Sequence, residues 1–169
     1  MVAIEGGREG GPGLARLERD DGAELGRFFY RLSPETIYRR FHSPITRPEQ
    51  AHPQFLLDVD HHDREAVVAV VDGEIVGVAR YVRRSGASSA EVAIVVADGW
   101  QRQGIATRML TALADFALAA GVEHFTMTMQ ADNQPVLRLM GRLYPGAAMT
   151  QSQGICETVV PVAPTGRWA

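Results

Sequence analysis

The chain has 169 residues, near the usual size of a single domain, and its 46% hydrophobic and 22% charged residues exclude a disordered or low-complexity protein. A net charge of -3 argues against a broad nucleic-acid-binding face, and a single cysteine excludes internal disulfides and Cys-based zinc sites. No apolar run approaches the roughly 20 residues that span a bilayer, so we expect a cytoplasmic protein that has no membrane partner.

The N-terminal part predicts a tail, a strand and two helices. Residues 1–13 are rich in glycine and are expected to form a flexible tail. Leu14–Leu17 is a candidate first strand, and Asp20 or Asp21 is a candidate cap of the helix that follows. Ser33 and Pro34 begin a second helix as its N-cap and first helical residue. A third short helix is expected to end over Gln54–Val59.

The periodicity then changes from helical to extended. Ala66–Val71 is a β-branched run, Asp72-Gly73 is a strong hairpin turn, and Ile75–Val82 is the partner strand. The apolar segment Ala90–Ala97 predicts a buried strand, and Gly104–Ala120 predicts an amphipathic helix that stops at Gly121. Three strands and one helix are expected beyond it: His124–Met129, a helix over Asn133–Leu143, and closing strands at Ala147–Gln151 and Ile155–Pro161.

The most informative motif joins the buried strand to the amphipathic helix. Gln101-x-x-Gly104-x-Ala106 stands at the helix start, where backbone N–H groups and the helix dipole favour an anion. Gly104 lets the backbone approach a phosphate that a Cβ would obstruct, and Arg102 with Arg108 offers compensating charge. The motif therefore predicts a pyrophosphate site.

In this position the motif resembles the Gln/Arg-x-x-Gly-x-Gly/Ala pattern of the GNAT superfamily of acetyl-CoA-dependent N-acetyltransferases. The resemblance covers about Arg16–Val160. Within the superfamily, Phe29–Phe41, Ala90–Ala93 and Asn133–Pro135 resemble the acetyltransferase domain of bacterial protein-lysine acetyltransferases. The resemblance implies a single α/β (α+β) domain over residues 14–162, with residues 163–169 as a C-terminal tail. Its mixed, mostly antiparallel sheet, flanked by helices, would be split to admit acetyl-CoA.

The resemblance also implies site residues. The backbone of the predicted strand Ala90–Ala97 would bind the pantetheine arm as if the arm were an added strand. Asn133 matches an asparagine that lies near this arm in the family. Glu91 matches the acidic residue that several lysine-directed members use as general base. The implied cofactor contacts are Ile94, Val95 and Val96 on the strand, and Gln101, Arg102, Gln103, Gly104, Ile105, Ala106 and Thr107 in the pyrophosphate loop.

A base is required on chemical grounds as well. A lysine amine has a pKa near 10.4, so reaching its neutral form at pH 7 costs about 4 to 5 kcal/mol. Glu91 lies in an otherwise apolar strand, where desolvation would raise its pKa toward a useful value. The alternative is that Glu91 lies at the strand edge with its carboxylate in plain solvent.

The sequence leaves three alternatives for the general acid. Many family members have a tyrosine seven residues after the asparagine, but here that position is Met140. Tyr144 is four residues further on, beside Pro145-Gly146, which indicates that the helix has ended. The acid is therefore Tyr144, water, or absent.

Other clusters admit two interpretations each. The His/Asp group from Asp58 to Asp63 could ligate a metal, although solvated loop side chains are the simpler explanation, and we assign no metal. Arg31, Arg39 and Arg40 lie where the family builds its acceptor lip, or else on a solvated helix face. All 17 basic residues are arginines, so this protein cannot modify lysines of its own.

We therefore predict an N-acetyltransferase that uses acetyl-CoA as cosubstrate and an amine, expected to be a protein lysine, as acceptor. Direct transfer needs no acyl-enzyme. The alternatives are an acetyltransferase for a small amine and a non-catalytic acyl-CoA sensor, the second because tyrosine is missing at position 140. A homodimer is a family-level expectation.

Overall fold

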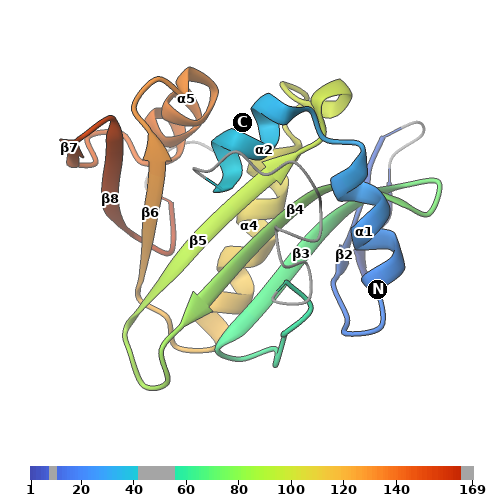
Figure 1. Cartoon of the computed structure of the whole chain (residues 1–169). Helices are drawn as coiled ribbons and strands as arrows, with labels where there is room; N and C mark the ends of the chain where they lie inside the picture. The colour runs from blue at the N-terminus through green and yellow to red at the C-terminus, as the bar shows by residue number, and fades with distance from the viewer. Residues whose placement is uncertain (8–10, 42–55, 165–169) are drawn as a thin grey trace.

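The computed structural model in Figure 1 describes residues 1–7, 11–41 and 56–164. Within these ranges the chain forms an eight-stranded sheet with the order β1-β2-β3-β4-β5-β6-β8-β7. Neighbouring strands are antiparallel, except that β5 and β6 are parallel. This is the mixed, mostly antiparallel α/β sheet that the family resemblance implies.

From residue 13 onward, the described elements follow the predicted order. The strands are β1 (Val2–Glu5), β2 (Gly13–Arg16), β3 (Arg64–Val71), β4 (Glu74–Arg83), β5 (Ser89–Val96), β6 (His124–Gln130), β7 (Met149–Ser152) and β8 (Ile155–Pro161). The helices are α1 (Gly22–Tyr30), α2 (Pro34–Phe41), α4 (Ile105–Ala119) and α5 (Gln134–Leu143), and a short 3-10 helix, η2 (Asp98–Trp100), precedes α4.

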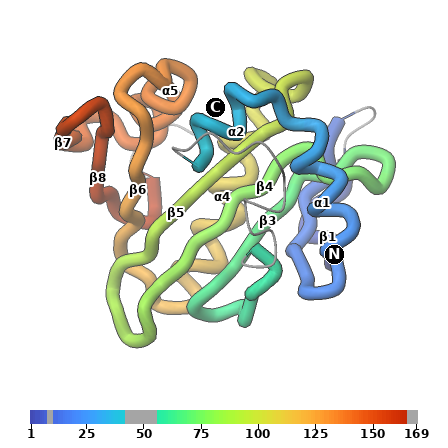
Figure 2. Tube along the Cα trace, viewed as in Figure 1, coloured from blue at the N-terminus to red at the C-terminus, as the bar shows by residue number. Residues whose placement is uncertain are grey.

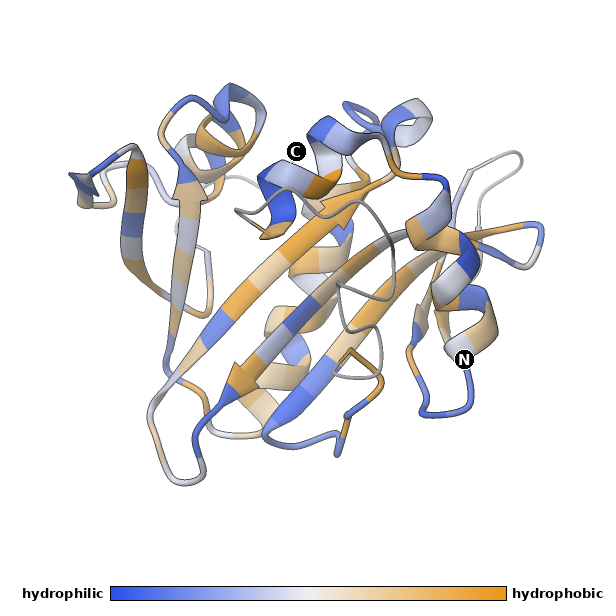
Figure 3. Cartoon of the chain, in the orientation of Figure 1, coloured by the Kyte–Doolittle hydropathy of each residue, from blue (hydrophilic) through white to orange (hydrophobic). Residues whose placement is uncertain are grey.

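Helices cover both faces of the sheet. In Figures 1 and 2, α1 and α2 lie in front of the central strands and α4 lies behind them. Successive residues of β3 therefore enter different cores: Ala66 and Val68 pack with the α1 side, whereas Val67 and Ala69 pack with the α4 side. Figure 3 shows the resulting concentration of hydrophobic residues along β3, β4 and β5. A strand buried on both faces explains the continuous apolar runs in the sequence.

Two glycines are required by the geometry of this core. A Cβ on Gly77 of β4 would lie 2.8 Å from Cε of Met109, so glycine here lets α4 approach the sheet closely. Gly73 has a φ of 80° and follows Asp72 with a φ of 49°. Two left-handed residues are typical of a type I′ hairpin, which confirms the turn predicted between β3 and β4.

The prediction of a flexible tail over residues 1–13 is wrong for Val2–Glu5. This segment forms strand β1, which pairs with β2 and extends the sheet. Strand pairing uses backbone groups, so the glycines that follow do not prevent it. The Glu5 carboxylate also forms an ion pair with Arg108 at 3.0 Å.

Two other predictions fall partly on residues outside the described ranges. For the expected helix over Gln54–Val59, Gln54 lies outside the described residues, and Leu57–Val59 are not helical. Of the predicted C-terminal tail, Ala163 and Pro164 are described, and residues 165–169 lie outside. Within the described ranges, each helix is too short or too polar to cross a bilayer.

Candidate active site

The site begins where two central strands part. β5 and β6 pair from Ser89 with His124 to Val92 with Met127, and no further pair joins them among the described residues. β4, in contrast, stays paired with β5 as far as Val96. The second half of β5 therefore has one edge bonded to β4 and one open edge, as Figure 1 shows. An extended ligand can add to such an edge as another strand would.

The directions of the N–H and C=O groups of β5 decide which residues can form hydrogen bonds at the open edge. The Ala97 N–H donates to the Val76 carbonyl of β4, and strand groups alternate in direction, so those of Val95 also face β4. The groups of Ile94 and Val96 then face the open edge. The Val96 carbonyl there accepts a hydrogen bond from Nε2 of Gln101 at 3.1 Å. The predicted set of three strand residues is thus reduced to two, because Val95 is committed to β4.

The loop after β5 leads directly into the N-terminus of α4. Gln101 to Gly104 are exposed, and Arg102 and Gly104 have φ values of 62° and 78°. Gly104 is the N-cap residue of α4, and the first turn of the helix contains no acidic residue. The first N–H groups of a helix have no intrahelical acceptor, so this end attracts an anion.

A pocket of about 230 Å³ occupies the angle between β5 and β6. Helices α2, α4 and α5 contribute its other walls. Apolar side chains predominate, and five polar residues also line it: Arg39, Arg40, Glu91, Thr128 and Asn133. The rest of the lining consists of Val92, Ala93, Ile94, Leu110, Met127, Met129, Val136, Leu139 and Met140.

This arrangement agrees with the comparison to known families. Residues 31–143 match the family model described as the acetyltransferase (GNAT) family. The chain belongs to this family. The chain is also 35% identical over 137 residues to acetyltransferase Pat of Mycolicibacterium smegmatis, a match that covers 79% of this chain and 40% of Pat.

One further relative and one solved structure are also similar to this chain. The chain is 32% identical over 122 residues to acetyltransferase PA5475 of Pseudomonas aeruginosa, covering 70% of this chain and 66% of that protein. The crystal structure of the GNAT domain of S. lividans PAT superposes with a TM-score of 0.82 at 24% identity, covering 95% of this chain and 94% of that one. At this identity the last comparison establishes the fold alone.

Glu91 lies at the pocket with its side chain exposed. On β5 it pairs in register with Val82 of β4 and Thr126 of β6, just before the strands part. The sequence left two alternatives for the Glu91 carboxylate, a cleft or open solvent. The structure combines them, because Glu91 lines the pocket and its side chain is also exposed. The negative charge of Glu91 acts on Arg40 and Arg80, where it opposes the lowering of their pKa values by burial.

Asn133 lines the same pocket but also has a structural role. It is the N-cap residue of α5, and its Oδ1 accepts a hydrogen bond from the Val136 N–H at 3.4 Å. The residue is buried, so the cap holds its side chain beside the open edge of β5. Asn133 thus positions α5 as well as facing the predicted cofactor arm.

Tyr144 does not lie at the pocket. Its side chain is buried in the core on the α4 side, where the hydroxyl donates to the Val162 carbonyl at 3.4 Å, and burial raises its pKa to about 12. The helix ends at Leu143, so the chain leaves the pocket wall before residue 144. The general-acid prediction for Tyr144 is therefore wrong. Met140, at the position of the family's tyrosine, lines the pocket.

The structure also changes the predicted role of the last residues of the pyrophosphate loop. Ile105 is buried in the core, so only its backbone N–H is available to a ligand, whereas Ala106 and Thr107 are half-buried on the first turn. Arg108 does not serve the anion site as expected. Its guanidinium donates to the Pro12 carbonyl at 2.8 Å and pairs with Glu5, so it fastens the N-terminal strand to α4.

Asp98 makes a long-range contact near the pocket loop that the sequence did not predict. Its carboxylate accepts hydrogen bonds from the Ser33 N–H at 3.0 Å, the Ser33 hydroxyl at 2.7 Å and the Thr36 hydroxyl at 2.8 Å. Burial opposes the shift, but these hydrogen bonds lower the pKa of Asp98. One side chain thus ties the start of α2 to the loop that precedes α4. Asp98 is 65 residues from Ser33, so no local pattern could have revealed the contact.

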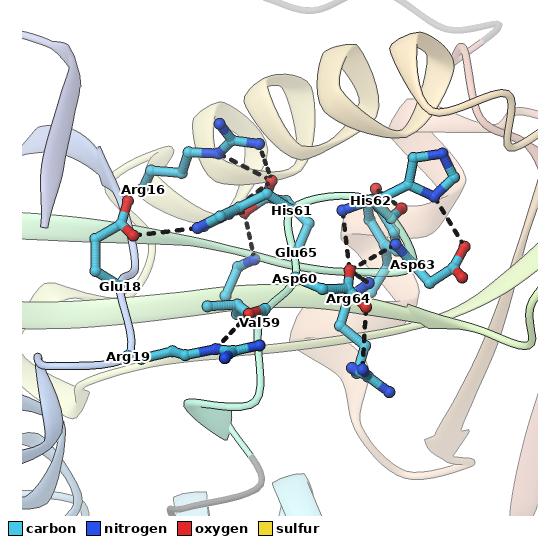
Figure 4. A network of polar contacts seen from close by, with 12 residues as sticks. Arg16, Glu18, Arg19, Val59, Asp60, His61, His62, Asp63, Arg64 and Glu65 are labelled. Carbon is cyan, nitrogen blue, oxygen red and sulfur yellow. Dashed lines mark hydrogen bonds and ion pairs between the residues drawn. The ribbon is translucent and has the colours of Figure 1, made fainter.

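The His/Asp cluster before β3 is used for structure. Oδ1 of Asp60 accepts the backbone N–H groups of His62, Asp63 and Arg64. His61 lies between two carboxylates, with 3.0 Å from Nδ1 to Glu65 Oε1 and 3.1 Å from Nε2 to Glu18 Oε2, as Figure 4 shows. In the described part of the chain, no three His, Cys, Asp or Glu side chains are grouped to hold a metal ion.

Proposed function

We propose that this chain transfers an acetyl group from acetyl-CoA to an amine, and that the amine is the side chain of a protein lysine. The observation that carries the proposal is the parting of the parallel strands β5 and β6 beside the carboxylate of Glu91. Because the matched segment covers only 40% of Pat and 66% of PA5475, activity and substrate are proposed for this chain and not transferred from those proteins.

The residues fit the thioester cosubstrate at both of its ends. The N-terminus of α4 offers N–H groups and a positive dipole to the pyrophosphate, and Gly104 keeps a Cβ away from it. The backbone groups of Ile94 and Val96 face the edge along which a pantetheine arm would lie. The pocket of about 230 Å³ at the end of this edge has room for an acetyl group and an entering amine side chain.

Glu91 supplies the proton acceptor. A lysine reaches the site as an ammonium ion, and about 4 to 5 kcal/mol separate it from the neutral amine at pH 7. The carboxylate of Glu91 takes that proton, directly or through one water. The amine nitrogen then forms its bond to the thioester carbonyl carbon, and the carbon–sulfur bond breaks. The nitrogen releases its second proton as the amide forms, and this proton passes to the departing thiolate or to water. A thiol of pKa near 8.5 leaves as thiolate, so loss of the family's tyrosine at Met140 does not stop the reaction.

The exposure of Glu91 supports a macromolecular acceptor. A base at an open pocket mouth reaches an amine carried on the surface of another protein, whereas a small amine gains more from an enclosed cavity. The resemblance of Phe29–Phe41 to protein-lysine acetyltransferases supports the same acceptor. We also propose a cytoplasmic location, which is supported by the presence of a single cysteine, Cys156. We further propose that the chain forms a homodimer, which light scattering would test.

The test combines purified protein, acetyl-CoA, a panel of lysine peptides and a panel of small amines. General-base catalysis contributes about 10²- to 10⁴-fold, so Glu91→Gln should lower kcat within that range while acetyl-CoA affinity stays the same. The rising limb of the pH profile should shift or flatten in this variant. Glu123→Gln, which alters an exposed carboxylate outside the pocket, is the matched control and should behave as wild type.

The outcomes separate the proposal from its alternatives. Turnover on small amines but not on peptides would replace the lysine acceptor by a small molecule. Tight acetyl-CoA binding without turnover on any amine would favour a sensor. Full turnover by Glu91→Gln would show that another group accepts the proton.

A further inference from the structure

Two arginines reach the pocket from the last turn of α2. Arg39 forms an ion pair, in which its guanidinium lies 2.6 Å from Oε1 of Glu35 one turn earlier. Arg40 makes no ion pair among the described residues. Its guanidinium lies 4.8 Å from the centre of the Phe41 ring, a contact that stabilises a cation without neutralising it.

Burial and a neighbouring like charge both act on the guanidinium of Arg40. Burial and the positive charge of Arg80 lower the pKa of Arg40 to about 10, although Glu91 opposes the shift. Burial likewise lowers the pKa of Arg80 on β4, against the charges of Glu91 and Asp58. A partly desolvated guanidinium in a cationic neighbourhood binds a carboxylate strongly, because the new pair offsets both the burial and the repulsion.

The same charges bear on the acceptor. α2 packs against β5 and β6, so Arg40 lies beside the strands between which the reacting amine must enter. An approaching ammonium ion is attracted by Glu91 and repelled by Arg40. An acceptor that also carries a carboxylate cancels this repulsion and gains a bidentate partner.

We propose that Arg40 is an acceptor-binding residue that holds a carboxylate next to the reacting amine, so that the enzyme acetylates amines with an acidic neighbour. This inference rests on the proposed acetyltransferase function and adds the substrate class. The recognised chemistry is a carboxylate close to an amine. An acidic residue beside a lysine in a peptide and the carboxylate of a free amino acid both provide it.

The experiment compares matched acceptors. One pair is a lysine peptide with Asp on either side of the lysine and the same peptide with Asn. The other pair is a short ω-amino acid and its carboxamide. Wild type should favour the acid of at least one pair by about tenfold or more in kcat/KM, and the pair that responds identifies the source of the carboxylate. Arg40→Gln should abolish the preference, and Arg40→Glu should reverse it toward a peptide with Arg flanks.

Controls separate this role from a structural one. Arg142→Gln, at an exposed arginine of α5 outside the pocket, should retain the wild-type preference, and Arg40→Lys should retain part of it. Thermal melting of each variant reports its folding. Calorimetric titration of the peptide pairs onto the protein provides a readout that does not need turnover, and the Asp peptide should bind wild type, but not Arg40→Gln, more tightly than the Asn peptide.

Failure of this inference differs from failure of the proposed function. Equal rates on both members of each pair, or a preference that persists in Arg40→Gln, would overturn the role of Arg40 while leaving the acetyltransferase proposal intact. If no amine is acetylated, the proposed function fails, and equal binding of the two peptides would then overturn the acceptor site as well.

Discussion

Gly104 offers the sharpest test of the cofactor loop. Its φ is 78°, and a Cβ built there would meet no atom of the protein within 4 Å. Alanine at this position is therefore penalised only for its left-handed backbone, by about 1 kcal/mol. In a chain of this size that loss lowers Tm by about 2 to 4 °C. A larger effect on ligand binding would need an atom outside the protein that the methyl group obstructs.

The assay is calorimetric titration of Gly104→Ala with acetyl-CoA, beside thermal melting. If the pyrophosphate lies against this turn, the affinity should fall by more than tenfold, or more than about 1.4 kcal/mol. Gly104→Asp should lose more, because it adds charge repulsion. The matched control is Gly73→Ala in the β3–β4 hairpin, where φ is 80° and the Cβ again meets nothing within 4 Å.

The control makes the result decisive. Gly73→Ala should lose about the same Tm as Gly104→Ala and bind acetyl-CoA as wild type does. Equal affinity of both alanine variants would refute the argument that the turn at Gly104 is the phosphate site.

Three further predictions concern other parts of the molecule. Tyr144→Phe removes one hydrogen bond of 3.4 Å in the core, so kcat should stay within about twofold of wild type and stability should fall by about 1 kcal/mol or less, as measured by denaturant unfolding. Glu65→Gln replaces a buried carboxylate that accepts hydrogen bonds from Arg16 and from the Ala66 N–H. The substitution should lower the free energy of unfolding by about 2 kcal/mol in the same assay. Because the folded-state pKa of Asp98 is lowered, the stability advantage of wild type over Asp98→Asn should be complete above the ordinary value of 3.8 and disappear as pH falls through the lowered pKa, as melts across that range would show. An advantage that persists in strong acid would contradict the contribution assigned to its charge.

Local patterns predicted most of the framework. The β-branched runs, the Asp72-Gly73 turn and the helix between Gly104 and Gly121 all express preferences of short segments, and the structure confirms each of them. The strand Val2–Glu5 was missed because the glycines beyond it dominate the composition, whereas the strand depends on a partner beyond residue 12.

The site was less predictable because it depends on the directions of backbone groups and side chains and on contacts between residues far apart in the sequence. Spacing identifies Gly104 and Glu91 but does not say that the backbone of Val95 faces β4. It indicates that the helix has ended by Tyr144, but it does not reveal that the ring of Tyr144 lies in the core. The partners of Arg108 come from the N-terminal segment, more than ninety residues away in the case of Pro12.

The carboxylate of Asp98 has a consequence for how this enzyme could change. It holds the first turn of α2, whose last turn carries Arg40, and it lies at the start of the segment that leads to Gly104. A substitution that changes acceptor choice by shifting α2 would therefore also disturb the segment that we propose binds the common cosubstrate. New acceptor preferences should arise more readily by exchange of side chains on a fixed α2 than by movement of the helix. Across descendants of this chain, the Ser33–Asp98–Thr36 link should then persist while position 40 varies.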